Sequence, residues 1–184
     1  GYVHFTGYFN ATVDFANSFG FSDAHVSNGL EDAYITKIDN YGTYVWTYTF
    51  GSNESDSSES VCSDDSDNIY LTGSFCQSLN FGQRWVVTDN KTSNGDLDAY
   101  VTQIKSDGSY GWTRTFGGSA DDSAYDITVD NSNNIFIAGY FQDQVYFADF
   151  WVFEMQRKPS VGSSDIFFVK LKPDGNYACA KQYG

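Results

Sequence analysis

Apolar and polar positions alternate with a period of two along most of the chain. In residues 98–105, for example, Ala99 and Val101 point to one side and the residues between them point to the other. Tyr, Phe, Val, Ile and Thr dominate such segments, whereas Gly, Asn and Asp gather between them. No stretch has apolar residues at i, i+3, i+4 and i+7 over the length of a helix. The pattern predicts an all-β protein.

The alternating segments recur with a period of about 66 residues. Gly7, Gly73 and Gly139 close three similar segments, and 73−7 and 139−73 are both 66. A second block starts three times at an aspartate, with spacings of 98−32=66 and 165−98=67. A third block ends three times at a Phe-Gly or Tyr-Gly pair. Three blocks in the same order at one period establish an internal repeat.

Each complete repeat is predicted to contain four strands. In the third repeat they span about 124–130, 134–141, 165–172 and 176–183. A long connection between the second and third strands carries one further extended piece, at 12–15, 78–81 and 144–147 in the three repeats. Four antiparallel strands per repeat are typical of a β-propeller blade. The sequence therefore predicts one partial propeller: blade 1 at 1–51, which lacks its first strand, blade 2 at 52–117 and blade 3 at 118–184.

The motifs of the second and third repeats resemble a known family. Asp98-Ala-Tyr-Val-Thr-Gln-Ile is followed by Asp107-Gly-Ser-Tyr-Gly-Trp-Thr-Arg-Thr-Phe-Gly-Gly, and Asn134-Ile-Phe-Ile-Ala-Gly-Tyr-Phe comes later. This order is similar to the SBBP-type (seven-bladed) β-propeller repeat, over nearly the whole chain. The resemblance implies a propeller fold and an extracellular setting, because the family occurs mostly in secreted and cell-surface proteins. It implies no reaction, since the repeat defines a scaffold.

Three blades are too few for a closed ring. Propellers close with roughly 4–8 blades, and an open flank leaves strand edges and apolar faces in water. We therefore expect the chain to belong to a larger or oligomeric propeller. Its expected partners are further blades of the same chain or other protein subunits.

Composition excludes two classes of partner. The 24 acidic residues outnumber the 10 Lys and Arg, giving a formal net charge of −14. A surface this acidic repels nucleic acid and anionic lipid head groups. No run approaches the roughly 20 apolar residues of a membrane-spanning helix. We expect neither nucleic acid binding nor a membrane span.

Repeated polar and aromatic residues favour structural roles. Asp32, Asp98 and Asp165 start the same strand three times, so we interpret them as caps of backbone N–H groups. Trp46 and Trp112 are expected to pack between blades. Only two histidines occur, neither near a cysteine, and no nucleophile or phosphate-binding motif is present. The sequence predicts no catalytic residue and no bound cofactor except, as an option, Ca²⁺.

Two loops are the candidates for that Ca²⁺. Each places oxygen-bearing side chains at alternate positions, and Ca²⁺ prefers six to eight oxygen ligands. Neither loop has the spacing of an EF-hand, and both lie where a hairpin turn is expected, so a solvated turn is the favoured interpretation. The candidate ligands are Asp64, Ser66 and Asn68 in one loop and Asp130, Ser132 and Asn134 in the other.

An insertion at 149–159 is the candidate for partner recognition. It is interpreted as peculiar to the third repeat, and it combines aromatic residues with the densest positive charge of the chain. Recognition residues often lie on such loops, although a local hydrophobic cap over the blade is an equally good interpretation. The candidate interaction residues are Phe150, Trp151, Phe153, Arg157 and Lys158.

Glycosylation sequons begin at Asn10, Asn53 and Asn90, and they matter only if the source glycosylates secreted proteins. The chain has three cysteines, Cys62, Cys76 and Cys179. Because the number is odd, at least one is free or bonds another chain. The hairpin register does not place Cys62 opposite Cys76, so we expect no bridge between them.

Three functions remain open at this point. The leading hypothesis is a non-enzymatic extracellular module with a structural, adhesive or protein-interaction role. The alternative is a carbohydrate-binding propeller, with repeated inter-blade clefts lined by aromatic and acidic residues. The third is a fragment of a propeller glycosidase or lyase, which would require unique polar residues on one face of the ring.

Overall fold

The computed structural model describes the whole chain except residues 148–156, and nearly all of its regular structure is antiparallel β-sheet. The first sheet has the strand order β1-β4-β5, the second β6-β7-β8-β9 and the third β10-β11-β14-β15. Each sheet lies within one of the predicted blade ranges.

The strands of the first sheet are β1 (Tyr2–Phe9), β4 (Asp32–Asp39) and β5 (Tyr44–Phe50). Those of the second are β6 (Ser57–Ser63), β7 (Ile69–Asn80), β8 (Asn90–Ile104) and β9 (Tyr110–Phe116). Those of the third are β10 (Asp122–Val129), β11 (Ile135–Phe141), β14 (Asp165–Leu171) and β15 (Tyr177–Tyr183).

The long connection in each repeat forms a small hairpin. In the first repeat β2 (Thr12–Asp14) pairs with β3 (Ala24–Val26), and in the third β12 (Gln144–Tyr146) pairs with β13 (Arg157–Pro159). In the second repeat the same hairpin is the far end of β7 and β8, where residues 78–80 pair with 90–92. Short 3-10 helices, η1 (Asn17–Phe19) and η2 (Gln83–Trp85), follow two of these strands. The expected extended pieces are therefore present, but each has a partner strand that the sequence pattern did not indicate.

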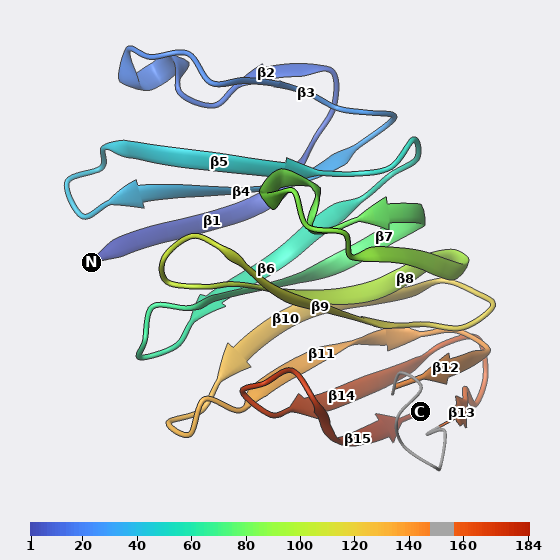
Figure 1. The fold of residues 1–184 in the computed structure, drawn as a ribbon. Coiled ribbons are helices and arrows are strands. Elements are labelled where there is room, and N and C mark those ends of the chain that lie inside the picture. The colour runs from blue at the N-terminus through green and yellow to red at the C-terminus, as the bar shows by residue number, and fades with distance from the viewer. Residues whose placement is uncertain (148–156) are drawn as a thin grey trace.

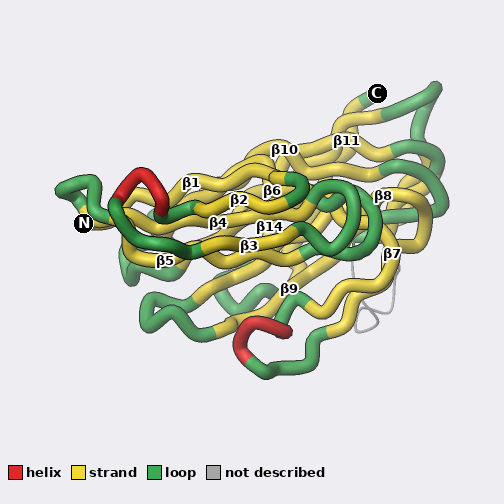
Figure 2. Tube along the Cα trace, turned by 90° about the horizontal axis from the view of Figure 1, so that it is seen from above, coloured by secondary structure: helices red, strands yellow, loops and turns green. Residues whose placement is uncertain are grey.

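The three sheets stack face to face, from the first in blue and cyan to the third in orange and red (Figure 1). Each sheet has a leading face toward the preceding sheet, marked by Val3 and Phe5 and their equivalents 66 and 132 residues later. Each also has a trailing face toward the following sheet, marked by Ala33 and Ile35 and their equivalents. The equivalents are Ile69, Leu71, Ile135 and Ile137 on the leading faces, and Ala99, Val101, Ile166 and Phe168 on the trailing faces. Seen from above, the strands of the successive sheets overlie one another (Figure 2).

Two hydrophobic cores fill the two junctions. Ile35 of the first sheet packs with Ile69, Leu71 and Phe75 of the second, and all four are fully or almost fully buried. The second junction repeats this arrangement, with Tyr70 and Val101 packed against apolar residues of the third sheet. Burying apolar surface is the main favourable term in folding, so these cores hold the stack together. The sheets depend on one another for stability.

Repeated aspartates and glycines complete each sheet. Asp32 accepts hydrogen bonds from the Asn28 backbone N–H at 3.1 Å and the Asn28 side-chain amide at 2.9 Å, which confirms the predicted capping role. Asp98 does the same with Asn94. A Cβ on Gly117 would stand 2.1 Å from Cγ of Asp98, so no other residue leaves room for this carboxyl group. The close approach explains the glycine that ends each repeat.

Candidate functional site

The trailing face of the third sheet is apolar and open. Ile166 is 59% exposed and Phe168 is 38% exposed. Their equivalents in the second sheet, Ala99 and Val101, are completely buried by the third sheet. The same positions are thus covered at one junction and exposed at the end of the stack.

Aromatic side chains on this open face pack against one another. The rings of Phe136 and Phe168 lie 5.6 Å apart, and those of Tyr125 and Tyr140 also lie 5.6 Å apart. The ammonium group of Lys170 lies 5.0 Å from the centre of the Phe136 ring. A preformed apolar face of this kind is typical of a protein-interaction surface.

The leading face of the first sheet is open in the same way. Val3 is 53% and Phe5 40% exposed, whereas the equivalent Ile69 and Leu71 are 2% and 0% exposed. The first sheet also ends at β1, whose counterparts β7 and β11 are each covered by a further strand. Each end of the described stack therefore exposes a sheet face that no neighbouring sheet covers.

A cleft of about 380 Å³ lies between the first and second sheets, and we call it the 1–2 cleft. Its walls come from the end of β5, the loop after β3, and the hairpin end of β7 with η2. The lining residues are Val26, Asn28, Tyr48, Thr49, Phe50, Gly51, Leu79, Asn80, Phe81, Gln83, Arg84 and Trp85. They include aromatic residues, as the carbohydrate-binding alternative expects, but none of them is acidic.

The aromatic wall of the 1–2 cleft is rigid. Trp46 stacks on Tyr48 with ring centres 4.1 Å apart, and the Tyr48 and Trp85 rings meet edge to face at 5.0 Å. The Trp85 indole N–H donates to the Gly108 carbonyl oxygen at 2.6 Å, which fixes its orientation. The guanidinium group of Arg84 lies 5.1 Å from the centre of the Tyr48 ring.

The corresponding position between the second and third sheets is closed by backbone. The Tyr146 N–H donates to the Gly117 carbonyl oxygen at 3.1 Å, forming an isolated bridge. Gly51 and Asn80 are the equivalents in the first junction, and there they face the 1–2 cleft instead. The described residues thus place the backbone bridge in the second junction and the cleft in the first, and the third-repeat counterparts of Gln83, Arg84 and Trp85 lie outside the described part of the chain.

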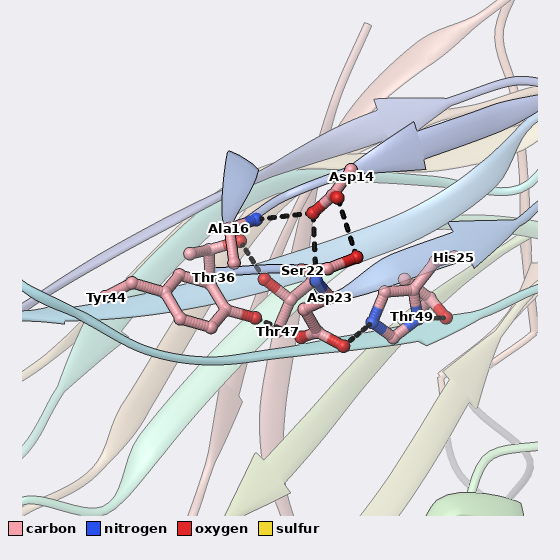
Figure 3. A network of polar contacts seen from close by, with 9 residues as sticks. All are labelled: Asp14, Ala16, Ser22, Asp23, His25, Thr36, Tyr44, Thr47 and Thr49. Atoms are coloured by element: carbon pink, nitrogen blue, oxygen red, sulfur yellow. Dashed lines mark hydrogen bonds and ion pairs between the residues drawn. The ribbon is translucent and has the colours of Figure 1, made fainter. Parts of the chain in front are cut away.

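A polar network fastens the first hairpin to the first sheet (Figure 3). Asp14 accepts hydrogen bonds from the Ala16 and Asp23 N–H groups at 3.1 and 2.8 Å. The hydroxyl of Tyr44 donates to Asp23. His25 lies between Asp23 and Thr49, at 3.1 and 3.0 Å.

The contacts that Asp23 makes with Tyr44 and His25 have equivalents one repeat later. Tyr110 donates to Asp89, and Lys91 forms an ion pair with Asp89 at 3.2 Å. These three residues are the 66-residue equivalents of Tyr44, Asp23 and His25. Because Lys91 replaces the histidine without changing the arrangement, we assign the network to fastening the hairpin.

The predicted Ca²⁺ loops are tight turns whose carboxyl groups are already hydrogen-bonded. Asp64 accepts bonds from the Ser66 and Asn68 N–H groups, both at 2.9 Å, and Asp130 accepts the same pair of bonds from Ser132 and Asn134. The side-chain amide of Asn134, which also donates to Asp130, and these backbone bonds hold the pKa of Asp130 below its usual value. No group of three or more His, Cys, Asp or Glu residues in the described part of the chain is arranged to hold a metal ion. Calcium binding stays a prediction.

The predicted interaction residues are only partly described. Phe150, Trp151 and Phe153 lie outside the described residues. Arg157 and Lys158 belong to β13, where their backbones pair with Tyr146 and Val145. One signal in the sequence was missed: 85+66=151, so Trp151 is in register with Trp85, and Phe147 with Phe81. The insertion is therefore less peculiar to the third repeat than we expected.

The remaining candidates are at the surface or in the stack. Asn10, Asn53 and Asn90 are all exposed. Cys62, Cys76 and Cys179 are free thiols, and burial raises the pKa of Cys62 to about 12. Trp112 packs against Gly175 of the next sheet, which confirms packing between sheets.

The profile of the SBBP β-propeller repeat matches residues 111–140. This segment runs from β9 through β10 into β11, across the second junction. The chain carries β-propeller repeats. The four-stranded antiparallel sheets of the stack are the blades that such repeats form.

A curated relative agrees with this result. The chain is 29% identical over 126 residues to an uncharacterized WD repeat-containing protein of Acanthamoeba polyphaga mimivirus. The match covers 64% of the chain but only 9% of the relative's own length. No helix among the described residues is long and apolar enough to cross a membrane.

Proposed function

We propose that the chain is a non-enzymatic propeller module of the cell surface or extracellular space, with a structural or adhesive role. The propeller repeat and the WD-repeat relative support a protein-interaction module. The extracellular setting rests on the family resemblance. The three exposed sequons are compatible with it.

One observation carries the proposal: the two ends of the stack expose the residues that each internal junction buries. The module works by placing Ile166 and Phe168 against the leading face of another propeller blade. Val3 and Phe5 receive a trailing face in the same way. The partner blades belong to the same polypeptide or to other subunits.

The test is the state of association of the chain with one end blocked. The double substitution Ile166→Glu and Phe168→Glu places two charges on the trailing face, where burial against another blade would be costly. We expect sedimentation velocity to show concentration-dependent association of the native chain and its loss in the double variant. Val86→Glu is the matched control, since Val86 is 96% exposed and lies on η2's C-terminal side, away from both open faces.

A native chain that stays a monomer of about 20.5 kDa at all concentrations would contradict association with other subunits and would leave blades of the same polypeptide as the partners. Equal association of the double variant and the native chain would contradict the proposal. Far-UV circular dichroism of each variant checks that the sheets are retained. Surface location is tested separately, by protease accessibility on intact cells of the source.

A further inference from the structure

We propose that the 1–2 cleft binds a peptide segment of a partner protein that presents a carboxylate next to an apolar side chain. The inference goes beyond the proposed function and does not depend on it, because association uses the two open faces and the cleft belongs to neither. Three features of the cleft support the inference: its charge, its free hydrogen-bond donors and its apolar floor.

The charge of the 1–2 cleft differs from that of the rest of the surface. The chain has a formal net charge of −14, yet none of the twelve lining residues is acidic and one, Arg84, is cationic. Two other hollows among the described residues contain carboxylates, with Glu54, Asp96 and Asp121 in one and Glu31 in the other. An anionic group in the 1–2 cleft is therefore attracted by Arg84, while the carboxyl group of Asp32 behind the wall is buried and already accepts two hydrogen bonds from Asn28.

The guanidinium group of Arg84 is positioned and unpaired. Its contact with the Tyr48 ring holds it at the cleft wall, and no described carboxylate forms an ion pair with it. A guanidinium group binds a carboxylate with two parallel hydrogen bonds, which is the strongest pairing available to it. Arg84 is thus set to receive a carboxylate.

A second donor, the side-chain amide of Asn80, also lines the cleft. The Oδ1 atom of Asn80 accepts hydrogen bonds from the Gly82 and Asp89 N–H groups at 3.1 and 2.8 Å. These bonds fix the amide and leave its NH₂ group, which donates only, available to a ligand. The side chain of Gln83 is exposed at the same rim.

The floor of the cleft is apolar. Leu79 and Phe81 are 5% and 3% exposed, and the half-buried Phe50 completes the surface between the sheets. An apolar side chain beside the carboxylate would lose contact with water here. An exposed carboxylate side chain beside an aromatic or aliphatic one is a common feature of extended peptide segments.

A peptide fits this wall better than a sugar does. A sugar ring binds to aromatic residues through their flat faces, and Trp46 already covers one face of Tyr48 at 4.1 Å. Arg84 lies over the same ring, and Trp85 is packed by Tyr48 and by Tyr110 at 5.5 Å. Stacking of a sugar on Tyr48 would have to displace one of these neighbours.

The test uses an acetylated and amidated tetrapeptide, Gly-Phe-Asp-Gly, and the same peptide with Asn in place of Asp. We expect saturable binding of the acidic peptide by isothermal titration calorimetry, weakened about tenfold or more by Asn in the peptide or by Arg84→Gln. Lys105→Gln is the control, because it removes an exposed charge that does not line the cleft. Arg84 is exposed, so its substitution leaves the sheets intact, as circular dichroism will check.

Three outcomes would overturn the proposal. The acidic peptide shows no saturable binding; the Arg84→Gln variant binds it as well as the native chain does; or glucuronate binds through Arg84 while the peptide does not. Failure here leaves the association of the open faces untouched, so the two proposals fail separately.

Discussion

At the scale of single residues, the stacking of the sheets buries two carboxyl groups, those of Asp98 and Asp122. They are 1% and 0% exposed; Asp98 lies within β8 and Asp122 starts β10, in neighbouring sheets. Burial raises the pKa of Asp98 to about 6. It raises that of Asp122 to about 8, with the nearby Asp98 charge adding to the effect. The protein keeps these carboxyl groups because they accept backbone N–H bonds, such as the one from Gly118 at 2.7 Å.

The raised pKa of Asp122 predicts a dependence of stability on pH. The folded state binds the proton more tightly than the unfolded state, whose aspartates titrate near 3.9, so this contribution to stability is complete below about pH 4. It is lost progressively as the pH rises to about 8. We expect the free energy of unfolding in urea to fall by about 1–3 kcal/mol over this range, and Asp122→Asn to flatten the fall.

Asp130→Asn is the control for that experiment. The pKa of Asp130 is lowered by the side-chain amide of Asn134 and by the backbone N–H groups of its turn, so the carboxylate adds stability at pH values above the pKa of the unfolded state. Its removal should therefore leave the decline toward pH 8 unchanged. An Asp122→Asn curve parallel to the native curve would show that another group causes the decline.

At the scale of elements, the first hairpin is held to its sheet by side chains, because β2 and β3 form a sheet separate from the main ladder. Tyr44 reaches from β5 to Asp23 before β3, and His25 reaches back to Thr49. Three-residue strands such as β2 and β3 are too short to be stable alone. The fastening explains why the same contacts recur in the second repeat.

The substitution Tyr44→Phe tests this fastening. It removes the hydroxyl donor to Asp23, and the expected cost is about 1 kcal/mol of local stability. Hydrogen–deuterium exchange should accelerate at the Phe15 and Ser27 amides, which are bonded within the hairpin, and not in β7 or β8. Tyr41→Phe is the matched control, since Tyr41 is 88% exposed. Unchanged exchange at the Phe15 and Ser27 amides would show that the hairpin does not depend on Tyr44.

The elements also show where sequence reasoning succeeds. The strands of the third sheet start and end within two residues of the predicted positions, because a period of two over seven residues is a strong signal. The partner strand at 24–26 was missed because three residues give no measurable period. The 1–2 cleft could not be predicted, since it depends on the approach of Gly51 and Asn80, which are far apart in the sequence.

At the scale of the whole molecule, the stack is directional. Each junction packs the trailing face of one sheet against the leading face of the next. The two ends of the described stack therefore leave one leading face and one trailing face uncovered. Such head-to-tail contacts close into rings or extend into filaments, according to the rotation at each step. The open ends are thus complementary to each other and not to themselves.

Complementarity gives a final prediction for two variants that each block one end. Phe168→Glu keeps the leading face, whose Phe5 is 40% exposed, and Phe5→Glu keeps the trailing face. Neither variant alone should associate, because each lacks one half of the junction and a charge buried there is costly. An equal mixture should form a one-to-one dimer and stop, since the two faces left outside the dimer are both blocked. Sedimentation of each variant and of the mixture measures this directly. Dimers of a single variant would show that a face binds itself. Species larger than a dimer in the mixture would show that a surface outside the two faces drives association.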